Sequence, residues 1–162
     1  MFSLENKNAV VTGATGGIGN SIVEKLDIKP ISITNFKSKS YDYVLLSETI
    51  QVLENPEQAL LEITRIGKSS IVTFPNFAHW KSRLGLFFLG RMPKTNALPQ
   101  EWYNTKNIHL CTIKDFESLC EKLEISIDKK TVINSNKESF LFKNIFPNFF
   151  GELITYQVSR KI

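Results

Sequence analysis

The sequence predicts a single α/β domain, residues 1–162, with a mostly parallel sheet and an antiparallel edge strand. Short apolar runs typical of buried strands alternate with segments whose apolar residues recur at helical spacing. The last two predicted strands follow each other without a clear helix between them, which favours an antiparallel edge. A length of 162 residues and a hydrophobic fraction of 42% suit one packed core.

The first half of the chain contains fewer predicted elements than its length would allow. A strand is expected at 9–12, and a glycine-rich turn and a helix at 18–26 follow it. Residues 27–40 are interpreted as a connector, because Pro30 ends the helical region and the pattern behind it is weak. The next buried strand is expected at 43–46.

The middle of the chain carries clear boundary signals. Asn55 is expected to be the N-cap of a helix with Pro56 at its first position, and Gly67 is placed to end that helix. A strand at 70–74 and an aromatic-rich helix at 77–89 are expected next.

The last third begins with a long polar connector at 90–109, and loops of this length are often functional. Thr112 is expected to cap a helix that runs through Leu123. Alternating strands at 125–133 and 153–158 then complete the sheet.

Composition excludes several classes of function. The net charge is +4, but Lys and Arg are scattered, so we expect a solvated surface and no nucleic-acid stripe. No apolar run is long enough to cross a membrane, and no signal peptide is expected. Cys111 and Cys120 form no CxxC pair, so no metal site is expected. Two isolated thiols suit a cytoplasmic protein.

The glycine-rich turn combines features that suit phosphate binding. In such a turn one glycine permits a tight bend, and another lets the backbone approach a phosphate at the helix N-terminus. Over residues 1–26 the spacing resembles the short-chain dehydrogenase/reductase family, most closely the 3-oxoacyl-carrier-protein reductases. That resemblance implies that Gly13, Gly17, Ile18 and Gly19 wrap the pyrophosphate of NAD(P). A turn kept only for packing is the alternative.

The catalytic pair of that dehydrogenase family is not found. The family uses a tyrosine with a lysine four residues later, and no tyrosine of this chain has that partner. An unassisted tyrosine, with a pKa of about 10, is a poor acid or base at neutral pH. An NAD(P)-dependent short-chain reductase of fatty-acid synthesis therefore stays only as the alternative function.

Residues 41–162 carry a second resemblance. The strand at 43–46 with the polar residues behind it resembles the fourth strand of class I methyltransferases. The later motifs are similar to the methionine biosynthesis protein MetW family. These motifs are Asn76-Phe77-Ala78-His79-Trp80, Gly90-Arg91-Met92-Pro93, Leu98-Pro99, Trp102-Tyr103, Asn107-Ile108-His109-Leu110-Cys111-Thr112-Ile113, Asp115-Phe116-Glu117 and Pro147-Asn148.

The second resemblance implies a methyltransferase-like, Rossmann-like fold and a place in methionine synthesis. It further implies either S-adenosylmethionine binding or a role as partner of a homoserine O-acyltransferase. The chain departs from the methyltransferase pattern between 26 and 41. This segment has room only for a connector, whereas a strand–helix–strand crossover needs about 30 residues. We therefore expect a truncated sheet without its second strand, in which the strands at 9–12 and 43–46 can pair directly. An inactive fusion is the remaining alternative.

The candidate site residues fall into two groups. Ser47 and Glu48 follow a parallel strand, where ligands gather in open α/β sheets, so they are candidate cofactor residues. Capping of the next helix is their structural alternative. The candidates for binding a substrate or a partner are Asn76, Arg91, Trp102, Tyr103 and His109. Each also has a structural interpretation, which is turn formation, core packing or simple exposure at the surface.

Overall fold

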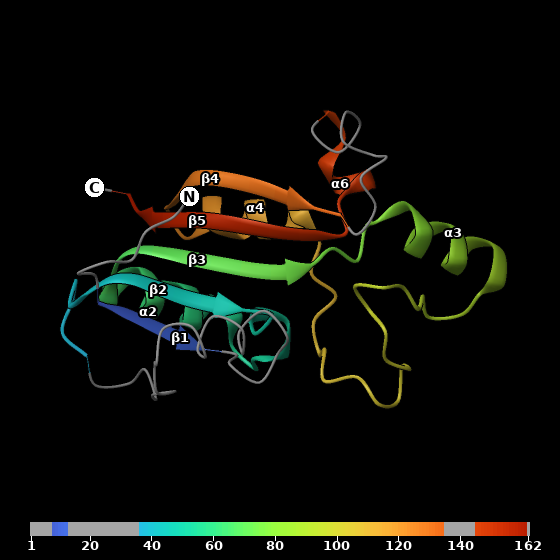
Figure 1. The fold of residues 1–162 in the computed structure, drawn as a ribbon, viewed down its shortest axis with the longest axis horizontal. Helices are drawn as coiled ribbons and strands as arrows, with labels where there is room; N and C mark the ends of the chain where they lie inside the picture. Colours follow the sequence, from blue (N-terminus) through green and yellow to red (C-terminus); the bar gives the residue numbers. More distant parts are fainter. Residues whose placement is uncertain (1–7, 13–35, 135–144, 162) are drawn as a thin grey trace.

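The computed structural model describes residues 8–12, 36–134 and 145–161, and these form a mixed sheet with helices against it (Figure 1). Within these ranges the sheet has five strands, in the order β1-β2-β3-β5-β4. Their bounds are β1 Ala9–Thr12, β2 Tyr41–Ser47, β3 Gly67–Pro75, β4 Ile125–Ile133 and β5 Leu153–Arg160. The predicted strands are confirmed, and β2, β3 and β5 extend beyond their predicted ends.

The first three strands run parallel, and β5 runs against both of its neighbours. β1 pairs directly with β2, with Val10 opposite Val44, which is the pairing that the sequence analysis considered feasible. The antiparallel edge is also confirmed, because the outer strand β4 pairs antiparallel with β5. The strand that runs opposite to all the others is β5, one position in from the edge.

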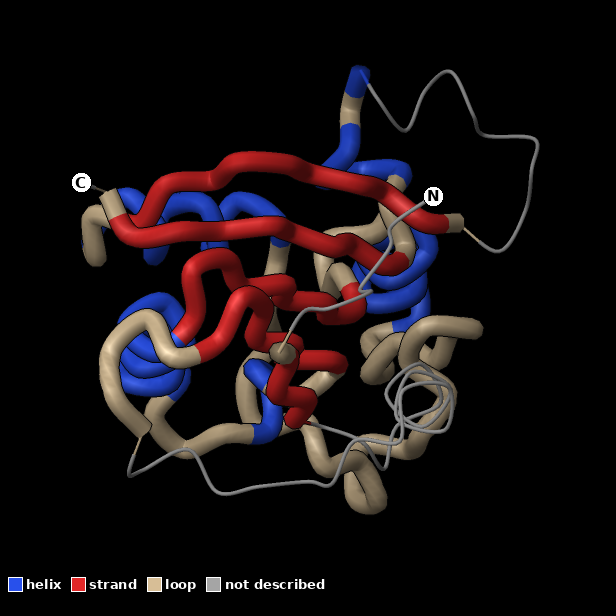
Figure 2. Tube along the Cα trace, turned by 60° about the vertical axis from the view of Figure 1, so that its left-hand side comes forward, coloured by secondary structure: helices blue, strands red, loops and turns tan. Residues whose placement is uncertain are grey.

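Helices α2 (Pro56–Ile66) and α4 (Ile113–Lys122) lie on one face of the sheet (Figure 1). Figure 2 shows the twisted strands in the middle of the molecule. The apolar faces of both helices and of β2, β3 and β5 meet in a single core. Its fully buried members include Val44, Leu46, Leu60, Ile63, Ile66, Val72, Phe74, Ile113, Phe116, Ile154, Tyr156 and Val158.

The predicted helix boundaries are confirmed at α2 and α4. Pro56 occupies the first turn of α2, and the Gly67 N–H donates to the Ile63 carbonyl at its end. Asn55 stands at the N-cap position, but its side chain makes no capping hydrogen bond. Thr112 does cap α4, because its Oγ1 accepts from the Asp115 N–H at 3.2 Å. The N-terminal side of α4 is therefore fixed by its own sequence.

The third long helix, α3 (Trp80–Leu89), stands at the carboxyl edge of the sheet and extends away from it (Figure 1). It begins at Trp80 and not at the predicted 77, because the Asn76 side chain holds the preceding residues in a turn by accepting from the Ala78 N–H. Two short elements, the 3-10 helix η1 (Ile50–Val52) and α6 (Pro147–Phe150), also lie at this edge. The predicted helix at 18–26 lies outside the described residues.

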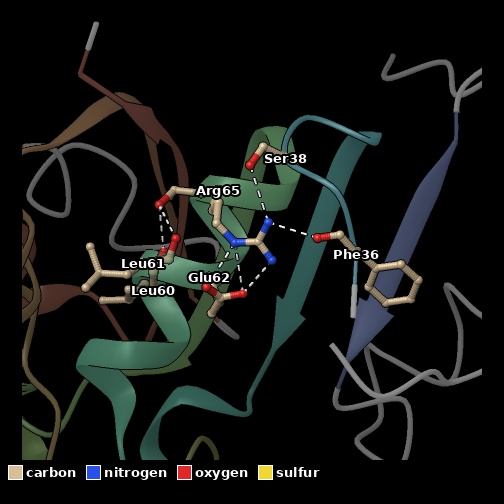
Figure 3. A network of polar contacts seen from close by, with 7 residues as sticks. Phe36, Ser38, Leu60, Leu61, Glu62 and Arg65 are labelled. Atoms are coloured by element: carbon tan, nitrogen blue, oxygen red, sulfur yellow. Dashed lines mark hydrogen bonds and ion pairs between the residues drawn. The ribbon is translucent and has the colours of Figure 1, made fainter. Parts of the chain in front are cut away.

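Polar contacts anchor the chain that leads into β2 against α2 (Figure 3). Arg65 donates from Nη1 to the Phe36 carbonyl at 2.9 Å and to Ser38 Oγ at 3.3 Å. Its Nη2 pairs with Glu62 Oε2 at 2.8 Å. This hydrogen-bonded ion pair lowers the pKa of Glu62 and raises that of Arg65. Residues 36–38 are thereby held over the C-terminal end of α2.

Candidate functional site

The candidate site is the carboxyl edge of the sheet, where β2 and β3 end side by side. Ser47 closes β2 and is buried, and its Oγ has no hydrogen-bond partner. Glu48 follows with a φ of 47°, a conformation that non-glycine residues seldom adopt and that clusters at functional sites. The Glu48 N–H donates to the Thr73 carbonyl at 2.8 Å, so this bend is fixed to the neighbouring strand.

Gln51 in η1 is the centre of the polar contacts behind Ser47. Its Nε2 donates to the Glu48 carbonyl at 3.1 Å, while its Oε1 is buried without a partner. The Gln51 carbonyl accepts from the N–H groups of Ile108 and His109 at 2.9 and 3.0 Å. Gln51 was not among the predicted site residues. The available signal was a polar residue inside the apolar run from Ile50 to Leu53.

His109, from the long connector after α3, also lies at this edge. Its Nε2 lies 2.9 Å from the Leu53 carbonyl, and its ring is exposed. Gln51, His109, Cys111 and Asp115 share a cavity of about 280 Å³ with apolar side chains of η1 and α4. The edge thus combines unpartnered neutral oxygens with a nearby cavity, an arrangement that binds polar groups.

Asn76, at the end of β3, is already occupied by structural contacts. Its Nδ2 donates to the carbonyls of Asn148 and Gly151 at 3.1 and 2.9 Å, and its Oδ1 accepts from the Ala78 N–H. The side chain therefore ties the end of β3 to α6 and to the start of β5. This geometry matches the turn-forming alternative raised for Asn76.

The remaining predicted partner residues lie away from these contacts, on the connector after α3. Arg91, Trp102 and Tyr103 are all exposed. The rings of Trp102 and Tyr103 pack edge to face with centroids 5.7 Å apart. Their exposure excludes the core-packing alternative. The structure therefore separates the candidates into a buried polar edge and an exposed connector.

A second cavity of about 280 Å³ lies between α3, α4 and α6. Arg83, Lys114 and Lys130 line it together with Glu117. Glu117 Oε1 accepts from Lys130 Nζ at 2.6 Å and from the Tyr156 hydroxyl at 2.7 Å. Burial, followed by the hydrogen bond to Glu117, raises the pKa of Tyr156 well above its usual range. Tyr156 therefore cannot act as a base at neutral pH.

Neither thiol of the chain is activated. Burial raises the pKa of both Cys111 and Cys120 to about 12, so both stay protonated at neutral pH.

Within residues 8–12, 36–134 and 145–161, His, Cys, Asp and Glu side chains form no cluster that could hold a metal ion. None of the helices in those ranges is long and apolar enough to span a membrane.

The predicted phosphate-binding residues lie outside the described residues. Gly13, Gly17, Ile18 and Gly19 all fall within residues 13–35. On the β2 side, which the structure does describe, Ser47, Glu48 and Gln51 carry a hydroxyl, a carboxylate and an amide. Such groups fit the polar parts of a nucleoside or amino-acid ligand.

Solved structures of methyltransferases share this fold. A SAM-dependent methyltransferase from Thermotoga maritima superimposes with a TM-score of 0.61 at 18% identity, covering 96% of this chain and 83% of that one. A SAM dependent methyltransferase from Archaeoglobus fulgidus gives 0.54 at 13% identity, covering 98% and 88%. At these identities the likeness shows the fold, which confirms the expected methyltransferase-like, Rossmann-like architecture.

A curated relative is the bifunctional methionine biosynthesis protein MetXA/MetW of Rhodopirellula baltica. It is 36% identical over 96 residues, which are 59% of this chain and 15% of that protein. The chain thus matches only a small part of that relative's length. No finding supports NAD(P) binding or the resemblance of the turn to dehydrogenases.

The sequence model of the methionine biosynthesis protein MetW family matches residues 4–158, so the match begins well before the 41–162 segment that carried the resemblance. The match includes β1 and the glycine-rich turn. With the shared fold and the curated relative, the chain belongs to the methionine biosynthesis protein MetW family.

Proposed function

We propose that this protein serves methionine biosynthesis in the cytoplasm as the partner of a homoserine O-acyltransferase. The observation that carries the proposal is the Rhodopirellula relative, whose name joins MetXA and MetW in one bifunctional chain. We take MetXA to be the homoserine O-acyltransferase that the family resemblance implies. Fusion gives two modules a high effective concentration, which benefits modules that act together.

The exposed connector supports a role through a partner. Trp102 and Tyr103 are more than 70% exposed, although Trp is highly buried on average in folded proteins and Tyr is intermediate. Aromatic and arginine side chains are enriched in protein interfaces, and Arg91 lies on the same connector. These residues are free to contact a partner without any rearrangement of the sheet.

Co-expression with the homoserine O-acyltransferase of the same organism tests this proposal. The two chains are expected to elute together from a size-exclusion column, and acetyl transfer to homoserine is expected to be faster in the complex than with the acyltransferase alone. Separate elution at micromolar concentrations, together with unchanged transfer, would reject the proposal.

A second candidate function is S-adenosylmethionine binding at the carboxyl edge. The observation that favours it is the pair of buried oxygens, Ser47 Oγ and Gln51 Oε1, that have no partner. Buried polar groups are nearly always hydrogen-bonded, so an unpaired pair at a strand end fits a bound polar ligand. Glu48 adds a carboxylate that can accept from hydroxyl or ammonium groups.

S-adenosylmethionine, when bound, supplies an electrophilic methyl group. The residues of this edge would bind and orient it: the hydroxyl of Ser47 can donate or accept, and Gln51 Oε1 can accept from an amino group. Cys111, the thiol that lines the neighbouring cavity, stays protonated at neutral pH, because burial raises its pKa to about 12. The unpartnered oxygens support binding of the ligand, so binding is the activity to test.

Two buried serines form a matched pair for that test. Ser47 has no partner, whereas Ser70 Oγ donates to the Ile63 carbonyl at 2.9 Å. We expect Ser47→Ala to weaken the binding of S-adenosylhomocysteine about 5-fold to 10-fold in calorimetry, the value of one hydrogen bond, without a loss of stability. Ser70→Ala should lower stability by about 1 kcal/mol and leave binding unchanged. Equal binding by wild type and Ser47→Ala would reject the site.

A further inference from the structure

Large apolar side chains are exposed on α3 to an unusual degree. Phe87 is 81% exposed, and Phe88 and Leu89 are 71% and 72% exposed. Ser82 is the one buried residue of the ten in this helix. Isolated helices of this length are marginal in water, and most helices are stabilised by packing an apolar face. Among the described residues, few of the contacts that usually stabilise a helix are therefore made by α3.

The apolar residues of α3 surround the helix. Leu86, Phe87, Phe88 and Leu89 are consecutive, so at 100° per residue they point to all sides of the last turn. A helix that lies on a membrane surface needs one polar face, whereas a helix that is apolar all round is normally enclosed by protein. The end of α3 thus fits a pocket better than a lipid surface.

The charge of the chain is concentrated around the same helix. Residues 77–110, which comprise α3 and the connector, contain five Lys or Arg residues and one Glu. The rest of the chain contains 15 basic and 15 acidic residues, so this segment accounts for the entire net charge of +4. Two copies of such a surface repel each other. An acidic partner surface would be attracted to it.

We propose that α3 and the connector are the surface that docks onto the homoserine O-acyltransferase, with the last turn of α3 inserted in an apolar pocket that has an acidic rim. This inference rests on the function proposed above and adds the location and chemistry of the contact. Phe87 is the expected anchor, because interface energy is concentrated in a few deeply buried, mostly aromatic or arginine, side chains. Arg91, which follows the C-terminal end of α3 directly after Gly90, contacts the acidic rim.

The test measures affinity by titration calorimetry between the full chain and the acyltransferase of the same organism. Leu86→Glu and Phe87→Glu change exposed residues and should leave folding intact, which the thermal melt of each variant checks. Each should weaken binding at least about 30-fold, the loss expected at an interface hot spot. Arg91→Glu should weaken binding and reduce its dependence on salt.

Leu61→Glu is the matched control. Leu61 lies on α2 and is 40% exposed, so the same change is made on a helix outside the proposed surface. Its affinity should stay within about threefold of the wild type, as for ordinary surface substitutions. A loss equal to that of Leu86→Glu would overturn the proposal, because the effect would then not be specific to α3.

The outcomes separate the docking surface from the proposed function. If the wild type binds and Phe87→Glu binds equally well, the docking surface is wrong and the acyltransferase partner stands. If the wild type itself does not bind, the function proposed above fails and the docking surface fails with it. Phe87-dependent binding to phosphatidylglycerol vesicles, or Phe87-dependent self-association in sedimentation, without an acyltransferase complex would assign α3 to lipid or to a second copy instead.

Discussion

Helices α3 and α4 are both ten residues long, yet they use their apolar side chains in opposite ways. α4 buries Ile113, Phe116 and Cys120 against the sheet, and Thr112 caps its first turn. α3 buries only Ser82, and the side chain of its N-cap residue His79 makes no capping hydrogen bond. The stability of α4 thus comes from within this chain. α3 keeps its apolar residues available for contacts that the described chain does not supply.

The largest predicted difference in stability is between Phe74, which lies on β3 and packs against α4, and Phe88 on α3. Phe74 is fully buried, with ring centroids 4.9 Å from Phe116 and 6.0 Å from Tyr156. Phe74→Ala should lower the free energy of unfolding by about 3–5 kcal/mol, because it removes apolar contacts and leaves a cavity. Phe88→Ala, at 71% exposure, should change it by no more than about 0.5 kcal/mol. Urea denaturation measures both, and similar losses would refute the contrast.

The next largest contrast in stability is between alanine substitutions at Gly67, between α2 and β3, and at Gly85 in α3. A Cβ at Gly67 would lie 2.8 Å from Val44 Cγ2 and 3.0 Å from the Ile63 carbonyl oxygen. Gly67→Ala should therefore cost about 1–3 kcal/mol through overpacking between α2 and β2. A Cβ at Gly85, within α3, meets nothing within 4 Å, so Gly85→Ala should stabilise by about 0.5–1 kcal/mol through helix propensity. Denaturation curves that shift in the same direction would contradict this account.

The cap of α4 should contribute a smaller amount. Thr112 Oγ1 accepts from the Asp115 N–H and donates to Asp115 Oδ2 at 2.6 Å. Thr112→Ala should lower stability by about 1 kcal/mol, the usual value of an N-cap. Thr112→Ser keeps the hydroxyl and serves as the control. If both variants lose the same stability in urea denaturation, the hydroxyl does not carry the effect.

The smallest prediction concerns pH. His79 is buried at the start of α3, and burial lowers its pKa below the unfolded value, with Glu152 opposing and Lys81 adding to the shift. The unfolded chain therefore takes up this proton first as the pH falls through about 6.5. Stability should decline below that pH. His79→Gln should flatten the slope of stability against pH between 7.5 and 5.5, and parallel slopes would contradict it.

Much of the fold was predictable because its signals are local. Pro56 and Gly67 bound α2, and Thr112 begins α4, through effects that act within one turn of chain. Direct pairing of β1 with β2 could be anticipated too, since the corresponding strands are adjacent in the sheet of the methyltransferases that the chain resembles. The family could also be recognised, because the motifs of the connector are read directly from the sequence.

The candidate site was predictable only in part. Ser47 was found from its place at a strand end, but its lack of a partner depends on atoms of other elements. Asn76 was found by the same rule, yet its amide bonds Asn148 and Gly151, which lie more than 70 positions later. Gln51 was missed, because sequence position alone does not reveal that a polar side chain in a short apolar run is buried.

The sequence by itself determined the alternation of strands and helices, the caps and the two apolar helix faces of the core, because periodicity and capping depend on neighbouring residues. Only the tertiary structure decided that β5 lies between β3 and β4, that Asn76 holds α6, and that α3 remains uncovered. These features depend on contacts between residues far apart in the chain. Apolar residues in a sequence predict that burial is favourable, but only the folded chain shows what covers them.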